Sequence, residues 1–466
     1  MFHVELSALS RILNSPGEPL SDDDTFTFDV TTTSVGSTTS GGTVQFKFEE
    51  NIGRENTVAN AGFSTGTYSR GNYSLPSAES DLRARVWHLS NYGQEAIANY
   101  QKSKLFRWRN SWSQSFSAVG ATDAPVQSLS HFVTPERFLV ALGTEDAATS
   151  TWNPLLVAWC SQEGGFTSND WTPAATNTAG DYLLSEGTRI IAGESMPFVN
   201  LIWTDTALYQ MRYLRDTTFV FGIDLLGVGC GLIGPNAKAR LPNGAVVWLS
   251  SSRQFMMWSG GAPQPIPCPV RENMLDDLAP VQEDLIYCGT NTRFNEVFWF
   301  YPDAATNECA KYVCWNYVEN HWTTGTWDIS SWHDRGALAY PMAAHADDGT
   351  VQFQEKGATD NGAAWNAWVR SAYIDAGDGD KLSFLGGIVP EMHDQQGPVD
   401  LTIYSKLWPQ GTETTTSGGT IAANTLKLDT RVTARQLAFR LEGNSAPSKW
   451  RLGRLVGDVE PLEDET

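Results

Sequence analysis

The chain is 466 residues long, which is too long for one ordinary core and predicts two or three domains. Its net charge is −21 at pH 7 and no basic patch stands out, which argues against tight, sequence-specific binding of duplex DNA, because such binding needs Lys and Arg. No run of about 18 apolar residues is present, so the sequence predicts no membrane-spanning helix.

The six cysteines form no CxxC pair and none lies beside a histidine at zinc spacing. This excludes a disulfide scaffold and predicts buried free thiols in strands of a protein made in a reducing cytoplasm. The cysteines are Cys160, Cys230, Cys268, Cys288, Cys309 and Cys314.

Residues 1–83 are rich in Ser, Thr and Gly, and we predict a small β module followed by an extended connector. The stretches TFTFDVTTT and GTVQFKFEE alternate at period two, which is typical of a hairpin. The start of the chain has no basic region and no apolar run of a signal peptide, although Leu9–Leu13 could form a short helix. Asp22, Asp23 and Asp24 precede the first strand, where we favour a solvated turn over a calcium site.

Residues 84–364 contain a repeat in which two apolar residues, any residue and a large residue follow one another. Another apolar run lies about ten residues earlier in each unit: EAIANY, RFLVALG, NLIWTD, AVVWLS, EVFWFY and PMAAHA. An outer segment usually follows, as in SFSAVG, DWTPA, TFVFGIDLL, PQPIPCPV and HWTTGTW. The large residues that end the repeat are Trp108, Trp159, Met211, Trp258, Trp315 and Phe353.

Six units of roughly 40–55 residues, each with about four strands, are typical of a β-propeller. A single four-stranded blade cannot bury both of its apolar faces, whereas blades stacked around an axis cover one another. The large residue that ends each third strand would then be a wedge between blades, since an aromatic side chain buries about 150–250 Å². We therefore interpret the tryptophan series as core packing and not as a sugar or cofactor site.

Residues 365–466 alternate at period two without the propeller spacing, which predicts a β-sandwich-like domain. We expect the stretch TETTTSGGTIAAN to be a loop and the acidic end VEPLEDET to be frayed. The fold class predicted from the sequence is thus all-β: a roughly six-bladed propeller between a small N-terminal β module and a C-terminal sandwich-like domain.

No known catalytic motif is present. His333-Asp334-Arg335 could form an acid–base cluster, but we favour a turn between strands. Asp375, Asp378 and Asp380 could contact Ca²⁺, yet an EF-type loop needs more oxygen ligands and a distal Glu. We therefore predict no catalytic, cofactor-binding or metal-binding residue, no cofactor and no enzymatic activity.

The stretch Arg189 to Val270 carries a family resemblance. It contains IIAGESMPFVNLIWTDTALYQMRYL, TFVFGIDLLGVGCGLIGPNA and AVVWLSSSRQFMMWSGGAPQPIPCPV, and it resembles the tail nozzle proteins of short-tailed bacteriophages (podophages), which include tail hub, stabilisation-type and tubular protein B-like proteins. GTNTRFNEVFWFYP, WTTGTWDISSWHDRGALAYPMAA, DAGDGDKLSFLGGIVPE and QLAFRLEGNSAPSKWRLG are also similar. The resemblance extends from about Ala84 to Glu460, and residues 1–60 match least.

The resemblance implies a structural virion protein of a short phage tail, assembled in the host bacterial cytoplasm. Six copies would form a ring-shaped nozzle that closes the DNA channel in the mature particle and conducts DNA during ejection. Its partners would be its own copies, the tail adaptor (head-to-tail connector) ring, tail fibre or spike proteins, a needle or plug protein, and double-stranded DNA passing without sequence-specific binding. We expect acidic propeller loops to line the lumen, since an acidic wall lets DNA pass without sticking.

Two alternatives remain at this stage. A carbohydrate-binding or carbohydrate-cleaving propeller would show exposed tryptophans together with paired carboxylates. A cell-surface interaction protein would need an export signal, which the sequence does not show. The fold alone does not decide between the nozzle function and these two alternatives, because propellers host many functions.

Overall fold

The computed structural model describes residues 56–57, 83–110, 117–147, 149–215, 219–306, 308–345, 349–360, 362–375 and 381–462. The chain divides into two compact units, Met1–Asn51 and Ile52–Thr466, of which the first lies outside the described residues. The predicted helix at Leu9–Leu13, the N-terminal hairpin and the turn at Asp22, Asp23 and Asp24 therefore stay predictions.

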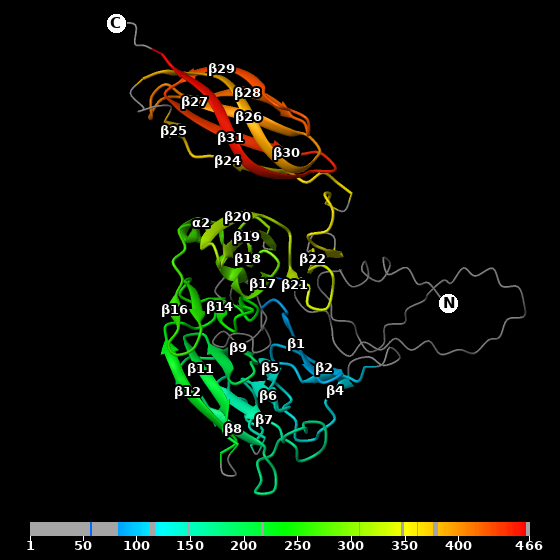
Figure 1. Ribbon diagram of the computed structural model, residues 1–466. Helices are drawn as coiled ribbons and strands as arrows, with labels where there is room; N and C mark the ends of the chain where they lie inside the picture. Colours follow the sequence, from blue (N-terminus) through cyan, green and yellow to red (C-terminus); the bar gives the residue numbers. More distant parts are fainter. Residues whose placement is uncertain are drawn as a thin grey trace, which may run out of the picture. The chain divides into compact units, whose positions relative to one another are not determined.

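Successive antiparallel sheets surround one axis in the described part of the chain (Figure 1). Blade 1 contains β1 (Trp87–Tyr92), β2 (Glu95–Tyr100), β3 (Phe106–Trp108) and β4 (Ser117–Ala118), and blade 2 contains β5 (Ser130–Val133), β6 (Leu139–Leu142), β7 (Leu156–Trp159) and β8 (Gly180–Leu183). Blade 3 contains β9 (Ile190–Glu194), β10 (Asn200–Thr204), β11 (Ala207–Tyr213) and β12 (Phe221–Val228), and blade 4 contains β13 (Lys238–Arg240), β14 (Val246–Leu249), β15 (Phe255–Trp258) and β16 (Gln264–Pro265). Blade 5 contains β17 (Tyr287–Asn291), β18 (Glu296–Pro302), β19 (Cys309–Asn316) and β20 (His321–Thr326), and blade 6 contains β21 (Ser331–His333), β22 (Met342–Ala344) and β23 (Val351–Phe353).

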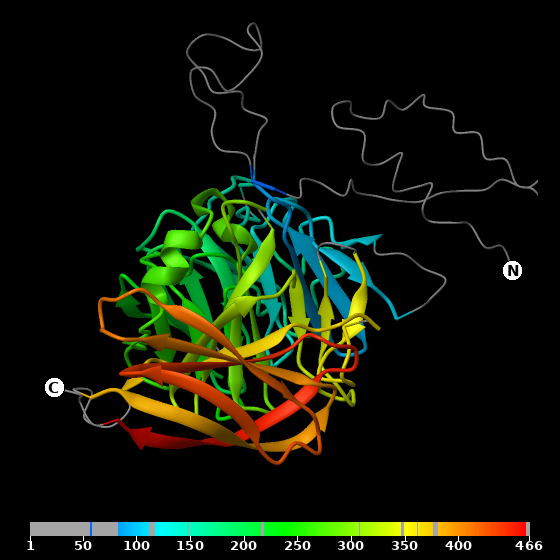
Figure 2. The same cartoon turned by 90° about the horizontal axis from the view of Figure 1, so that it is seen from above.

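Within each blade the strands pair in chain order, so every blade is an antiparallel meander. Blade 6 returns to the side of blade 1, and the two lie next to each other in both views (Figures 1 and 2). This arrangement confirms the predicted all-β fold class with a β-propeller. In the described ranges no helix has the length and apolar character needed to cross a bilayer.

Strand β10 shows how the sequence packs neighbouring blades. Successive side chains of a strand point to opposite faces of its sheet. Trp203 accordingly belongs to the cluster shared with blade 4, while Ile202 belongs to the cluster shared with blade 2. Trp203 meets Trp248 of β14 edge to face, with ring centroids 5.6 Å apart. An apolar run with no polar alternation thus fits a strand that is covered on both faces.

The six expected wedge residues all lie on third strands, but they do not all act as wedges. Trp159, Met211, Trp258 and Trp315 are buried, whereas Phe353 is 49% exposed, so the wedge prediction is wrong for blade 6. In the described residues β23 is the last strand of its sheet, which leaves this side chain at an open edge. Three fully buried indoles lie instead on second strands, Trp203, Trp248 and Trp299, and a fourth, Trp171, lies in a loop.

The outer segments SFSAVG, TFVFGIDLL, PQPIPCPV and HWTTGTW overlap with β4, β12, β16 and β20, and DWTPA is the segment predicted wrongly. The segment DWTPA is a loop, and the outer strand of blade 2 is β8, further along the chain. The carboxylate of Asp123 accepts hydrogen bonds from the backbone N–H groups of Trp171 and Thr172, each at 2.9 Å, so these amides need no strand partner. A helix, α2 (Arg271–Asp277), and a 3-10 helix, η1 (Pro280–Leu285), connect blades 4 and 5 and were not predicted.

The C-terminal strands form two sheets around a separate core. One sheet contains β24 (Ala367–Arg370), β25 (Ile374–Asp375), β27 (Val399–Lys406), β28 (Thr414–Ile421) and β30 (Gln436–Gly443), and the other contains β26 (Ser383–Gln396), β29 (Leu428–Ala434) and β31 (Lys449–Pro461).

Two predictions for these C-terminal strands are wrong. The expected loop TETTTSGGTIAAN contains β28, because β27 pairs with its threonine-rich run from end to end. The expected frayed end VEPLEDET is strand as far as Pro461, which pairs with Ser383, while its last four residues lie outside the described residues. The predicted domain limits 1–83, 84–364 and 365–466 stay predictions.

Candidate functional site

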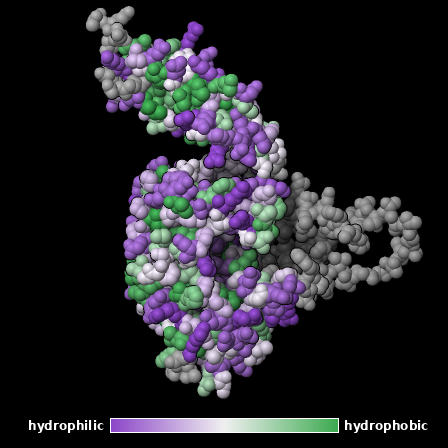
Figure 3. Space-filling view, in the orientation of Figure 1, coloured by the Kyte–Doolittle hydropathy of each residue, from purple (hydrophilic) through white to green (hydrophobic). Residues whose placement is uncertain are grey.

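The first strands of the blades line two adjoining cavities at the propeller axis. The Asp334 cavity has a volume of about 540 Å³ and is lined by β9, β13, β17 and β21 together with the residues that follow β21. The histidine cavity has a volume of about 450 Å³ and is lined by β1, β5, β9 and β13 with the residues around them. Glu194 and Lys238 line both cavities. Figure 3 shows the hollow between the blades, with hydrophilic residues around it.

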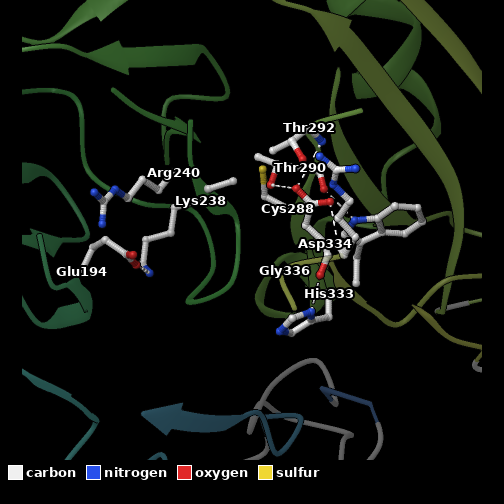
Figure 4. Close-up of a pocket in the computed structure, with 13 residues that line it drawn as sticks. Glu194, Lys238, Arg240, Cys288, Thr290, Thr292, His333, Asp334 and Gly336 are labelled. Carbon is white, nitrogen blue, oxygen red and sulfur yellow. Dashed lines mark hydrogen bonds and ion pairs between the residues drawn. The ribbon is translucent and has the colours of Figure 1, made fainter. Parts of the chain in front are cut away.

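Two carboxylates stand on opposite walls of the Asp334 cavity (Figure 4). Lys238 donates a hydrogen bond to Glu194 and forms an ion pair with it. On the other wall, Asp334 Oδ2 accepts the backbone N–H of Thr292 at 3.2 Å and lies 3.5 Å from the hydroxyl of Thr290. The indole N–H of Trp332 donates to the Thr290 carbonyl at 2.8 Å and so supports that wall. The cavity thus has one hydrogen-bonded carboxylate on each of two opposite walls.

His333 ends β21, and Asp334 and Arg335 begin the connection to β22, so the turn expected between strands holds for Asp334 and Arg335 but not for His333. The same residues line the Asp334 cavity, which the sequence analysis did not anticipate. The signal was present, because the segment follows the first strand of a blade, and first strands lie nearest the axis of a propeller. No sequence pattern showed which residues would face it.

The histidine cavity contains two imidazoles from neighbouring blades. His88 lies on β1 and His131 on β5. Burial, followed by the charges of His131 and Lys238, lowers the pKa of His88 to about 3. Burial also lowers the pKa of His131 to about 4, against a smaller opposing effect of the Ile97 carbonyl. Both imidazoles are therefore neutral at pH 7.

The remaining residues singled out in the sequence do not assemble a site. Asp375 accepts a hydrogen bond from Gln436 at 2.8 Å, while Asp378 and Asp380 lie outside the described residues. Among the residues that the structure describes, no three His, Cys, Asp or Glu side chains are grouped to hold a metal ion. All six cysteines are free and five are buried, with Cys268 half-buried. Burial raises the pKa of Cys160 to about 12, which disfavours a reactive thiolate there.

No protein-family model and no curated protein matches this sequence. The fold defines the chain as a β-propeller protein, and solved structures of that kind are similar to it. One is the exo-β-1,3-galactanase of Phanerochaete chrysosporium with galactose, with 8% identity, a TM-score of 0.29 and coverage of 80% of this chain and 94% of that chain. YCF48 bound to D1 peptide has 8% identity and a TM-score of 0.30, covering 53% and 68%. PorZ of Porphyromonas gingivalis has 10% identity and a TM-score of 0.34, covering 79% and 51%.

Glycoside hydrolases are among these structures, which contradicts the prediction that the chain is not an enzyme. We withdraw that prediction, which rested on the lack of a known motif. A propeller can build an active site from side chains on several blades, and no short motif then marks it. At these identities the similarity concerns the fold alone.

Proposed function

We propose that the chain is a subunit of the ring-shaped nozzle of a short phage tail, as its sequence resemblance suggests. The structural observation that supports a self-assembling protein is the apolar outer rim of blades 2 and 3. Tyr182 and Leu183 of β8 are exposed there, as are Leu225 and Val228 of β12. Large exposed apolar patches usually mark protein–protein contacts. A rigid propeller presenting such a rim is suited to pack beside its own copies.

The nozzle proposal is tested by the mass of the protein in solution. We expect light scattering to show assemblies larger than the 51.2 kDa chain, either alone at high concentration or on the adaptor ring. Leu225→Glu should reduce assembly, because it places a charge in the apolar rim. The matched control is Glu186→Gln, an exposed residue near the end of β8, which should assemble like the wild type. A monomer at every concentration, with and without the adaptor ring, would overturn the proposal.

The Asp334 cavity favours a second candidate, a propeller that binds or cleaves carbohydrate. Glycoside hydrolysis uses two carboxyl groups on either side of the scissile bond, and Glu194 and Asp334 stand on opposite walls. Reducing-end release from β-linked oligosaccharides tests cleavage, and Asp334→Asn should abolish any release. If release is absent, or persists unchanged in Asp334→Asn, this cavity is not the catalytic site of a glycosidase.

A further inference from the structure

The histidine cavity contains buried polar atoms that no protein group satisfies. Nε2 of His88, Oγ of Ser90 and Nε2 of His131 are buried and have no hydrogen-bond partner. All three residues line the cavity, and His131 is only 5% exposed. Buried polar groups in proteins are nearly always hydrogen-bonded, so an unsatisfied set around one cavity indicates that something else occupies it.

Asn99 determines which nitrogen of His131 carries the proton. The Asn99 amide nitrogen lies 3.3 Å from the Ser128 carbonyl and 3.4 Å from the Tyr100 carbonyl, and both can only accept hydrogen bonds. Its Oδ1 is therefore the atom that lies 2.7 Å from Nδ1 of His131. Since Oδ1 can only accept, Nδ1 carries the proton and Nε2 is left as an acceptor. A ligand must offer His131 a donor, such as a hydroxyl group.

The charges around the cavity favour a neutral ligand. Lys238 is already paired with Glu194, so neither provides an uncompensated charge for an anion or a cation. The two imidazoles are neutral, and the described residues provide no third ligand that would complete a metal site. The volume of about 450 Å³ lies within the usual range of ligand pockets, roughly 300–1,000 Å³.

We propose that the histidine cavity binds a small neutral ligand rich in hydroxyl groups, a monosaccharide or a polyol, with Nε2 of His131 accepting a hydrogen bond from one hydroxyl. This inference extends the second candidate function, carbohydrate binding, and is independent of ring assembly. It places binding on blades 1 to 4, beside the Asp334 cavity and not within it.

The test uses the full chain with ¹⁵N-labelled histidine and three probes: galactose, glucose and sorbitol. We expect at least one probe to shift the Nε2 resonance of His131 saturably, while that nitrogen keeps its unprotonated chemical shift. Ser90→Ala should weaken this binding about tenfold, as expected for one lost hydrogen bond, without disturbing the fold. His393→Gln, an exposed position on β26, should bind like the wild type.

The outcomes separate this inference from both proposed functions. The proposed site is refuted if none of the three probes, tested up to the limit of its solubility, shifts the Nε2 resonance of His131. Water alone would then fill the cavity. The site is equally refuted if inorganic phosphate, and none of the three probes, shifts Nε2. Saturable binding without release of reducing ends supports the binding site and leaves only the proposed cleavage without support. The mass of the assembly tests the nozzle proposal and has no bearing on the binding site.

Discussion

Glu355 of blade 6 acts electrostatically on the carboxyl group of Glu296 of blade 5. Glu296 begins β18 of blade 5, and Glu355 follows β23 of blade 6. Burial, together with the charge of Glu355, raises the pKa of Glu296 to about 7. Asn291 donates a hydrogen bond to Glu355 at 3.1 Å and holds it in place. Blades 5 and 6 therefore meet at a carboxyl pair whose charge changes near neutral pH.

Glu296 makes a contribution to the free energy of unfolding that is lost as pH rises. Because its pKa is raised from 4.5 to about 7, Glu296 holds more protons in the folded chain than in the unfolded chain between these pH values. Its contribution is fully present below pH 4.5 and is lost as pH rises through 7. After allowance for solvent screening of a partly exposed group, we expect a loss of about 1–2 kcal/mol in the free energy of unfolding.

Urea unfolding of Glu296→Gln at several pH values checks this prediction. The variant should be more stable than the wild type at pH 8, because it removes a half-buried carboxylate that is repelled by the charge of Glu355. It should show a flatter pH profile between 4.5 and 7. Glu186→Gln, an exposed control, should follow the wild type. Parallel profiles for Glu296→Gln and the wild type would contradict the assigned contact.

The buried histidines predict the opposite slope in acid. His88 and His131 have folded pKa values of about 3 and about 4, below the ordinary value of 6.5. The unfolded chain therefore binds more protons than the folded chain in this range. The stability that the two neutral histidines contribute is fully present above pH 6.5 and falls as pH drops toward 4. His131→Gln should reduce this acid sensitivity, since a glutamine amide can still donate to Asn99 but takes up no proton. Urea midpoints between pH 4 and 7 measure the effect, and an unchanged acid slope in the variant would contradict it.

The sequence predicted the blades well because their signals are local. EAIANY corresponds to β2 from end to end, and NLIWTD begins with β10, since apolar runs between turn residues already specify such strands. The outer strand of blade 2 was harder to predict. The segment DWTPA resembles a strand in composition, but Asp123 accepts hydrogen bonds from its backbone amides, and the outer strand is β8, further along the chain.

The candidate site could not be predicted from the sequence in the same way. Glu194 and Lys238 are 44 residues apart and meet only because blades 3 and 4 pack side by side. His88 and His131 look like isolated strand residues, since the sequence gives no sign of the neighbour that each one meets. Sites built from one residue per blade leave no short motif, and closure of the propeller brings their members together.

Gly231 lies in the segment CGLIGPNA, where a side chain should not fit. A Cβ at this position would lie 2.3 Å from the carbonyl carbon and oxygen of Asp205, which are backbone atoms and cannot turn away. We expect Gly231→Ala to lower the free energy of unfolding by about 1–3 kcal/mol or more. At Gly120 the nearest atom to an added Cβ is 4.0 Å away, so Gly120→Ala should change stability by less than about 0.5 kcal/mol. Similar losses in the two variants would show that the backbone around Gly231 relaxes freely.

The contact between Trp203 and Trp248 tests whether the blades are stabilised by packing against each other. Both indoles are fully buried and meet edge to face across blades 3 and 4. Trp203→Ala should cost about 3–5 kcal/mol, because it removes apolar contacts and leaves a cavity. A double-mutant cycle with Trp248→Ala should give a coupling energy of about 0.5–1.5 kcal/mol, the usual value for an aromatic pair. Phe198→Ala, at a 91% exposed position, should leave stability within about 0.5 kcal/mol of the wild type. A coupling energy of zero, measured by urea unfolding, would mean that the two blades do not stabilise each other through this pair.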